Sequence, residues 1–234
     1  MFLMADSFHY TRSRKKLIIR LLVASLLMTG MNYVVQIVFP NPGVMLMNNA
    51  FSSFLMATLY MLFFDIIKNG ASEKNAKKII GGVLLCIVPL LTAVPAYLLQ
   101  LSGISLSEEA YLAAQQAGTL LQLPGPVSLA CAALSLIIPN ILTVEGGYVT
   151  VIMGVLFFVF RGRRWAQALV LVAVSVLTFI VQGASSPQWL MVFAVIPMFL
   201  YNGEKGRGMK NFFYVFYPVH IYLLYIIATL TLGA

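Results

Sequence analysis

Long apolar runs alternate with short polar segments along this chain. Four runs, at residues 17–39, 46–64, 79–100 and 165–181, each approach the roughly 20 apolar residues that a membrane-spanning helix needs. The pattern predicts membrane helices at about residues 17–39, 45–67, 78–100, 142–160, 164–182, 187–201 and 211–232. The predicted fold class is therefore all-α, a polytopic transmembrane helix bundle of about 7–8 membrane helices. Residues 1–234 are expected to form a single transmembrane domain.

The region 101–143 has a weaker pattern. It holds one apolar stretch of borderline length, "PVSLACAALSLIIPN". Glu108 and Glu109 would be costly inside a membrane crossing, and Pro139 interrupts a helix. These features favour a re-entrant or interfacial segment, and a pair of crossings is the alternative.

The composition supports the membrane assignment. Of 234 residues, 61% are hydrophobic and 9% are charged, and the mean hydropathy is +0.92. A soluble domain is about one quarter charged, so this chain cannot cover a water-facing surface. The sequence predicts an integral membrane protein with the lipid bilayer as its surroundings.

The positive charges are placed on one side of the predicted bundle. The net charge is +8, and all 15 Lys and Arg fall in four short clusters, within residues 12–20, 68–78, 161–164 and 205–210. Short basic loops face the cytoplasm, and the loops of the opposite side carry no Lys or Arg. This pattern predicts cytoplasmic basic loops, and it argues against nucleic acid as a partner.

Glu145 is a candidate functional carboxylate. The run 147–160 is too short to cross a roughly 30 Å core, so its helix is expected to start near Leu142 and to include Glu145. A carboxylate within the membrane indicates a functional site. The alternative is a carboxylate in the outer headgroup region, stabilised by a helix N-terminus.

His220 is the second candidate, because it lies about 13 Å into the last predicted helix. Histidine is a common general acid or base near neutral pH, and Tyr217 shares its helix face. The alternative is a histidine satisfied by a carbonyl or a tyrosine within a bundle. His9 in "FHYTRSRKK" is a third candidate, or part of the basic flank of the first helix.

The stretch "YNGEKGR…FFYVFYPVHIYLLY" resembles the C-terminal signature of the TraX family of membrane proteins. "FHYTRSRKKLIIRLL" resembles the family's basic stretch, and "EGGYVTVIMGVLFFVFR" resembles its mid-chain Glu-Gly-Gly-Tyr segment. Asn48 and Asn49 resemble its polar helix start. The family is similar to the polytopic membrane acyltransferases. The resemblance implies acyl transfer, in particular acetyl transfer, from cytoplasmic acyl-CoA to a protein (pilin-like) or envelope acceptor. It also implies a location in the bacterial inner membrane and a connection with conjugation.

The resemblance assigns roles to particular residues. Catalysis would involve His220, Glu145 and His9, with no metal. Acyl-CoA, the co-substrate, would be bound by Arg12, Arg14, Tyr201, Asn202, Gly203, Lys205, Arg207 and Tyr217. Tyr201, Asn202, Tyr217 and His220 are expected to line one cytoplasm-facing cavity together with the first basic cluster.

The chain departs from the family pattern at its N-terminus. The family resemblance places an Asp-His pair, the expected catalytic base, in an earlier helix, and this sequence contains no such pair. We therefore expect the chain to be incomplete at its N-terminus relative to the family, with slow turnover or none. Two other functions stay open: a transporter for a small or lipid-linked substrate, and a non-catalytic relative.

Overall fold

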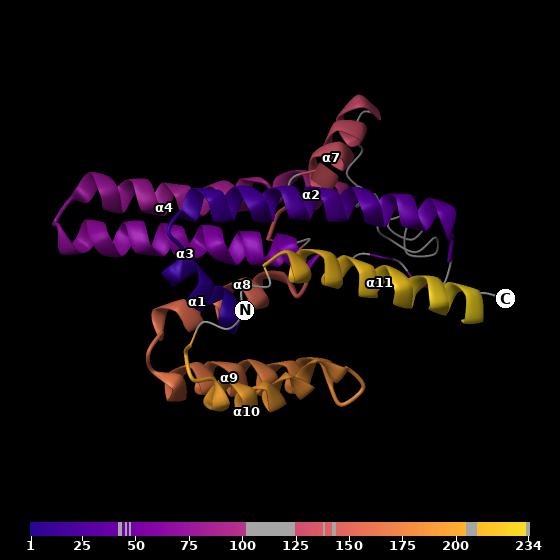
Figure 1. The fold of residues 1–234 in the computed structure, drawn as a ribbon. Coiled ribbons are helices and arrows are strands. Elements are labelled where there is room, and N and C mark those ends of the chain that lie inside the picture. The colour runs from indigo at the N-terminus through magenta and orange to yellow at the C-terminus, as the bar shows by residue number, and fades with distance from the viewer. Residues whose placement is uncertain are drawn as a thin grey trace.

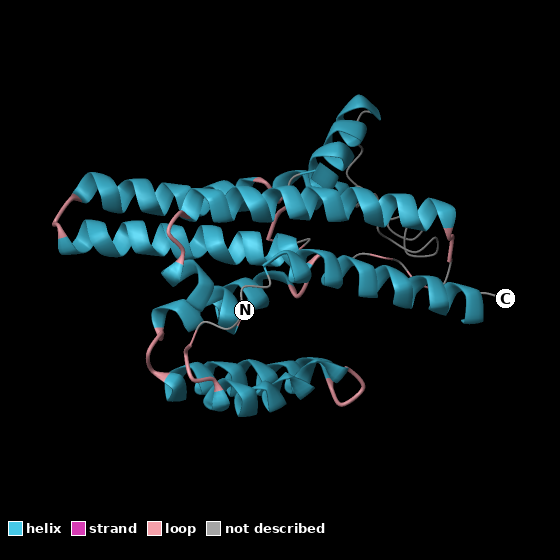
Figure 2. Cartoon of the chain, in the orientation of Figure 1, coloured by secondary structure: helices cyan, strands magenta, loops and turns pink. Residues whose placement is uncertain are grey.

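The structure is a computed structural model that describes residues 1–41, 44, 46, 48–101, 125–137, 139–141, 144–204 and 210–232. The described residues form helices joined by loops and turns, without strands (Figure 2). The helices are, in chain order, α1 Phe2–Tyr10, α2 Arg14–Val38, α3 Ala50–Ser72, α4 Ala76–Leu91, α5 Val94–Leu101, α7 Gly125–Ile137, α8 Gly147–Val159, α9 Arg164–Gln182, the 3-10 helix η1 Pro187–Ala194, α10 Val195–Leu200 and α11 Lys210–Leu232. The all-α prediction is confirmed for this part of the chain.

The helices form two groups that meet through α1 and α8. Helices α2, α3 and α4 run side by side, and α11 follows part of α2 (Figure 1). Helix α9 and the η1–α10 segment form a second, antiparallel group. The buried core lies where the two groups meet and includes Phe8, Met28, Met61 and Phe157.

Among the described residues, four helices are long and apolar enough to cross a membrane: α2, α3, α9 and residues 212–231 of α11. Residues 147–159 and 187–200 form shorter apolar helices. The outward faces of the long helices are rich in exposed leucine, valine and isoleucine, as lipid contact requires. The chain is thus a multi-pass membrane protein by these four helices, and the total of 7–8 crossings stays a prediction.

Several predicted helices differ from the observed ones, and the one expected at 187–201 consists of the 3-10 helix η1 followed by α10. The expected helix at 78–100 is divided into α4 and α5, because Pro95 has no N–H to continue the hydrogen bonds of the preceding turn. The helix expected from residue 45 begins at Ala50, where the Asn49 side chain accepts a hydrogen bond from the Ser52 N–H. Asparagine is a favoured residue at this capping position.

The basic segments lie toward one end of the molecule. The start of α2 and the α3–α4 and α8–α9 connections point to the left in Figure 1. The α9–η1 connection and the C-terminus point to the right. This placement agrees with a one-sided charge distribution for the three basic clusters that precede residue 165. The apolar stretch of the predicted re-entrant segment corresponds to α7, whose 13 residues are too few to cross the membrane, so a re-entrant or interfacial segment stays a prediction. Residues 102–124 of the same region lie outside the described part.

Candidate functional site

Glu145 lies in a turn just before α8, not inside the helix. Gly146 and Gly147 have φ values of 76° and 59°, a conformation that favours glycine and interrupts a helix. A Cβ at Gly146 would lie 2.0 Å from the Thr150 hydroxyl oxygen. The expectation that the helix starts near Leu142 is therefore wrong at its N-terminal end. Glu145 instead stands at the N-terminus of α8, where the helix dipole favours a negative charge.

The Glu145 carboxylate accepts hydrogen bonds from two other parts of the fold. The Tyr217 hydroxyl donates to Glu145 Oε2 at 2.9 Å, and the Asn48 amide donates to Oε1 at 3.3 Å. The Ser53 hydroxyl donates to the Glu145 backbone carbonyl at 2.7 Å. These residues, with His220, are called the Glu145 cluster below.

Tyr217 links this cluster to α3. Its hydroxyl oxygen accepts a hydrogen bond from the Ala50 N–H at 3.0 Å, while its proton goes to Glu145. The Tyr217 ring packs edge-on against Phe51, with centroids 5.4 Å apart. The N-terminal ends of α3 and α8 therefore both approach the carboxylate, and both ends carry partial positive charge.

His220 lies beside Tyr217 on α11. Its Nδ1 is 2.9 Å from the Phe216 carbonyl oxygen, which can only accept, so Nδ1 carries the proton. In the neutral ring, Nε2 then holds the lone pair that can accept a proton. The ring stacks on Phe216 with centroids 5.1 Å apart and meets Tyr217 edge-on at 5.5 Å. His220 is partly exposed, so Nε2 has access to a ligand.

Side chains of α2 hold the non-helical chain that leads into this cluster. Gln36 bonds both the N–H and the carbonyl of Leu46, at 3.2 Å each. Asn32 donates to the Asn48 carbonyl at 2.9 Å, and Asn49 donates to the Ser25 carbonyl and the Thr29 hydroxyl at 3.0 Å each. Ser25 and Asn32 lie about 16 and 27 Å along α2 from Arg14. Irregular backbone at membrane depth requires such partners.

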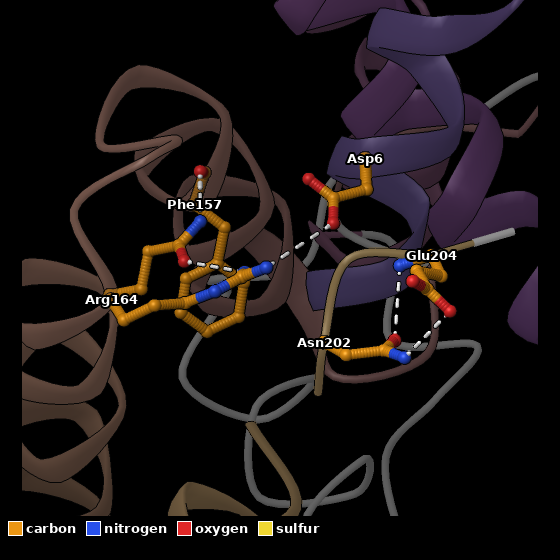
Figure 3. Close-up of polar contacts among 6 residues, drawn as sticks. Asp6, Phe157, Arg164, Asn202 and Glu204 are labelled. Carbon is orange, nitrogen blue, oxygen red and sulfur yellow. Dashed lines mark hydrogen bonds and ion pairs between the residues drawn. The ribbon is translucent and has the colours of Figure 1, made fainter. Parts of the chain in front are cut away.

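A second polar site surrounds Arg164 at the start of α9 (Figure 3). Arg164 donates to the Gln167 side chain at 3.2 Å and lies 3.9 Å from the Asp6 carboxylate. Gln167 is fully buried and donates to the Phe157 carbonyl at 2.8 Å. The ion pair with Asp6 is at the long limit of such contacts, so it leaves guanidinium N–H groups available for another anion.

Aromatic rings cover the Arg164 guanidinium. Its central carbon lies 4.7 Å from the Phe2 ring centroid and 5.2 Å from the Tyr201 centroid. These contacts are in the range of cation–π interactions. Asp6, Arg164 and Gln167 with Phe2 and Tyr201 are called the Arg164 cluster.

The loop after Tyr201 is turned toward the same region. Asn202 Oδ1 accepts from the Glu204 N–H at 3.0 Å, and the Asn202 amide donates to the Glu204 carboxylate at 3.1 Å (Figure 3). This is the pattern of an asparagine-stabilised turn. Gly203 has a φ of 78°, which explains a glycine at this position. Lys205 and Arg207, predicted to bind the cofactor, lie outside the described residues.

The structure divides the other predicted residues among different surroundings. Arg14 pairs with Asp65 at 2.5 Å and lies over the Phe8 ring, so this predicted phosphate ligand already has a carboxylate partner. Arg12 and His9 are exposed, and His9 packs against Tyr10. The expected single cavity is instead two clusters, with Tyr201 in one and Tyr217 and His220 in the other.

Sequence reasoning missed the role of Arg164. The "RGRRW" segment entered only as a topology signal, and the contact with Asp6 joins residues far apart in the chain. Arg161 was missed as well. Its Nη1 is buried and has no hydrogen-bond partner among the described residues, while its guanidinium carbon lies 5.6 Å from the Tyr10 centroid. The described residues contain no group of three or more metal-binding side chains.

Comparison with known sequences gives one family. The sequence model described as TraX protein matches residues 121–228. No curated protein matches the chain, and no solved structure does. The match contains Glu145, Arg164, Tyr201, Tyr217 and His220, whereas the resemblances noted at residues 9–23 and 48–49 lie before it. Over residues 121–228, this membrane protein matches the TraX family.

Proposed function

We propose that this protein is a membrane acyltransferase that takes an acyl group, most simply acetyl, from cytoplasmic acyl-CoA. The observation that carries the proposal is the division of the TraX segment into two sites of complementary chemistry. The Arg164 cluster offers a guanidinium and aromatic rings at the basic end. The Glu145 cluster offers a carboxylate, a phenol and an imidazole.

The donor would be held at the Arg164 cluster. Arg164 and Arg161 have few polar partners, and guanidinium groups suit phosphate recognition. Tyr201 and Phe2 provide ring faces beside Arg164. This assignment replaces Arg14, which pairs with Asp65, and keeps Tyr201, Asn202 and Gly203 at the entrance to the site.

The acceptor would react near His220. His220 Nε2 takes the proton from the acceptor hydroxyl or amine as the acceptor atom bonds to the acyl carbon. The bond from that carbon to the CoA sulfur breaks, and the thiolate leaves to be protonated as CoA. Glu145 acts on His220 through Tyr217: its bond to the Tyr217 hydroxyl and the contact of the Tyr217 ring with the imidazole fix the position of the α11 turn that carries His220.

The test is acetyl transfer from labelled acetyl-CoA by the protein in nanodiscs supplied with membrane extract. His220→Ala should lower turnover by about 100-fold or more, the range for losing a general base. His9→Ala is the matched histidine control and should retain turnover. Glu73→Gln is the carboxylate control for Glu145→Gln and should also retain turnover. Loss at His9 with retention at His220 would overturn the assignment of His220.

Transport of a small anion is the second candidate. It is favoured by the non-helical chain before Ala50 and by the approach of two helix N-termini to one point, features of transporter sites. Liposomes distinguish the two functions. Uptake of a labelled anion without acyl-CoA would support transport, whereas label transfer that requires acyl-CoA would support the acyltransferase.

A further inference from the structure

A groove of about 660 Å³ separates α2 from α11 and is lined by none of the polar side chains of the two clusters. Its α2 wall includes Arg20, Val23, Leu27 and Met31, and its α11 wall includes Val215 and Tyr222. The α2 residues 23, 27 and 31 recur every four positions, so they lie on one face of the helix. All three apolar side chains are exposed, Val23 and Met31 to about half and Leu27 to 65%.

The groove is closed at its base by ordered contacts. Phe51 stacks on Tyr214 with ring centroids 5.5 Å apart. The Tyr222 hydroxyl reaches the Met28 carbonyl at 3.4 Å and bridges the two helices. The apolar groove is therefore a defined feature of the fold, and it opens to the surroundings along the exposed side of α2.

One end of the groove carries a cation without a carboxylate partner. Arg20 Nε donates to the Lys16 carbonyl at 3.2 Å. Within the described residues, no carboxylate pairs with Arg20, although Arg14, six residues earlier, pairs with Asp65. The terminal N–H groups of Arg20 are thus open to an external anion, and the guanidinium geometry matches a phosphate.

The length of the groove fits one leaflet of a bilayer. From Ile19 to Met31, its α2 wall extends about 18 Å at 1.5 Å per residue. Half of a roughly 30 Å hydrocarbon core is about 15 Å. Arg20 lies at the end of this wall nearest the basic segments, where the headgroups of that leaflet would be. An acyl chain can therefore follow the groove while its phosphate reaches Arg20.

We propose that this groove binds one acyl chain of an anionic phospholipid from the leaflet on the basic side, with the lipid phosphate paired to Arg20. The site is separate from the proposed acyl transfer and does not depend on it. The lipid would contact Phe51 and Tyr214, and Phe51 in turn packs against Tyr217. Occupancy would thus support the α3–α11 contact behind the Glu145 cluster.

The contribution of the lipid's negative charge to binding is tested by native mass spectrometry. The purified protein is titrated with phosphatidylglycerol or with phosphatidylcholine of identical chains. One cation near a membrane surface corresponds to about a fivefold preference for the anionic lipid. Arg20→Gln should remove this preference and Arg20→Lys should keep most of it. Lys15→Gln, an exposed cation on the same helix, is the matched control and should keep it fully. Equal binding of both lipids, or equal effects of Arg20→Gln and Lys15→Gln, would overturn the proposal.

Filling the groove tests the chain component. Ala24→Phe places a ring in the groove and should lower the affinity for both lipids several-fold. Gly30→Leu should not, because Gly30 does not line the groove and the space around its Cβ is open. Two other results would also count against the proposal. One is complete competition by inorganic phosphate, which would show an anion site without a chain. The other is that the protein forms a dimer, that Ala24→Phe dissociates this dimer, and that lipid binding stays unchanged.

Discussion

The Glu145 cluster and the Arg164 cluster are both polar and lie in the same bundle, but they are built differently. Around Glu145, two side chains donate to the carboxylate and a third donates to the backbone carbonyl, and α2 side chains hold the neighbouring backbone. Around Arg164, one guanidinium has a distant carboxylate, one amide partner and two aromatic rings. The first arrangement is largely satisfied internally, so it fixes structure. The second keeps unused hydrogen-bond donors, which suits binding of an exchangeable anion.

The largest expected effect is a difference in labelling between the two ends of the molecule, which should lie on opposite sides of the membrane. Ser185→Cys, in the α9–η1 connection, should react completely with a membrane-impermeant thiol reagent added outside intact cells. Ser72→Cys, at the end of α3 beside the basic connection, should not react. The background is Cys86→Ser and Cys131→Ser in both variants. Labelling of Ser72→Cys from outside would invert the orientation and place the Arg164 cluster away from cytoplasmic acyl-CoA.

The next largest effect is on stability near the Glu145 cluster. Asn49→Ala removes the cap of α3 and leaves the Ser25 and Thr29 oxygens without this donor. Its free energy of unfolding should fall by about 2–3 kcal/mol, measured by denaturant titration in detergent. Asn202→Ala, which loses only local contacts in an exposed turn, is the control and should cost less than about 1 kcal/mol. Similar losses of stability in the two variants would show that the hydrogen bonds of Asn49 stabilise the fold no more than those of the Asn202 turn.

The smallest effect is on binding at the Arg164 cluster. Arg164→Lys keeps the charge near Asp6 but removes the planar guanidinium, so the affinity for CoA should fall about fivefold with little change in stability. Isothermal titration with CoA measures the change. Arg163→Lys, at the exposed neighbouring position, is the matched control and should retain the affinity of the parent protein. An equal loss in both variants would mean that general positive charge, not this guanidinium, binds the ligand.

The sequence predicts the local features of this fold well. Hydropathy locates α2, α9 and α11 to within about three residues, because membrane helices depend on long apolar runs. It also singles out Glu145, Tyr217 and His220 as residues of interest. It misplaces the start of α8, because hydropathy contains no information on the left-handed backbone conformation of the two consecutive glycines there.

The contacts between distant residues could not be predicted in the same way. Arg14 is equally suited to a phosphate or to a carboxylate until Asp65 is seen beside it, 51 positions later in the chain. Arg164 looks like any loop cation until Asp6, Phe2 and Tyr201 surround it. A single sequence gives the chemistry of each side chain but not the partner that decides whether that chemistry is available.

The chain before Ala50 also constrains how the protein is made. Asn32, Gln36 and Asn49 would each be costly in lipid if α2 or α3 entered the membrane alone. In the fold, each one satisfies backbone or side-chain groups of the other helix or of the segment between them. Insertion of the two helices together, as one hairpin, is therefore energetically favoured over insertion of each helix alone. A substitution among these three residues should act first on the yield of inserted protein, before any chemistry begins.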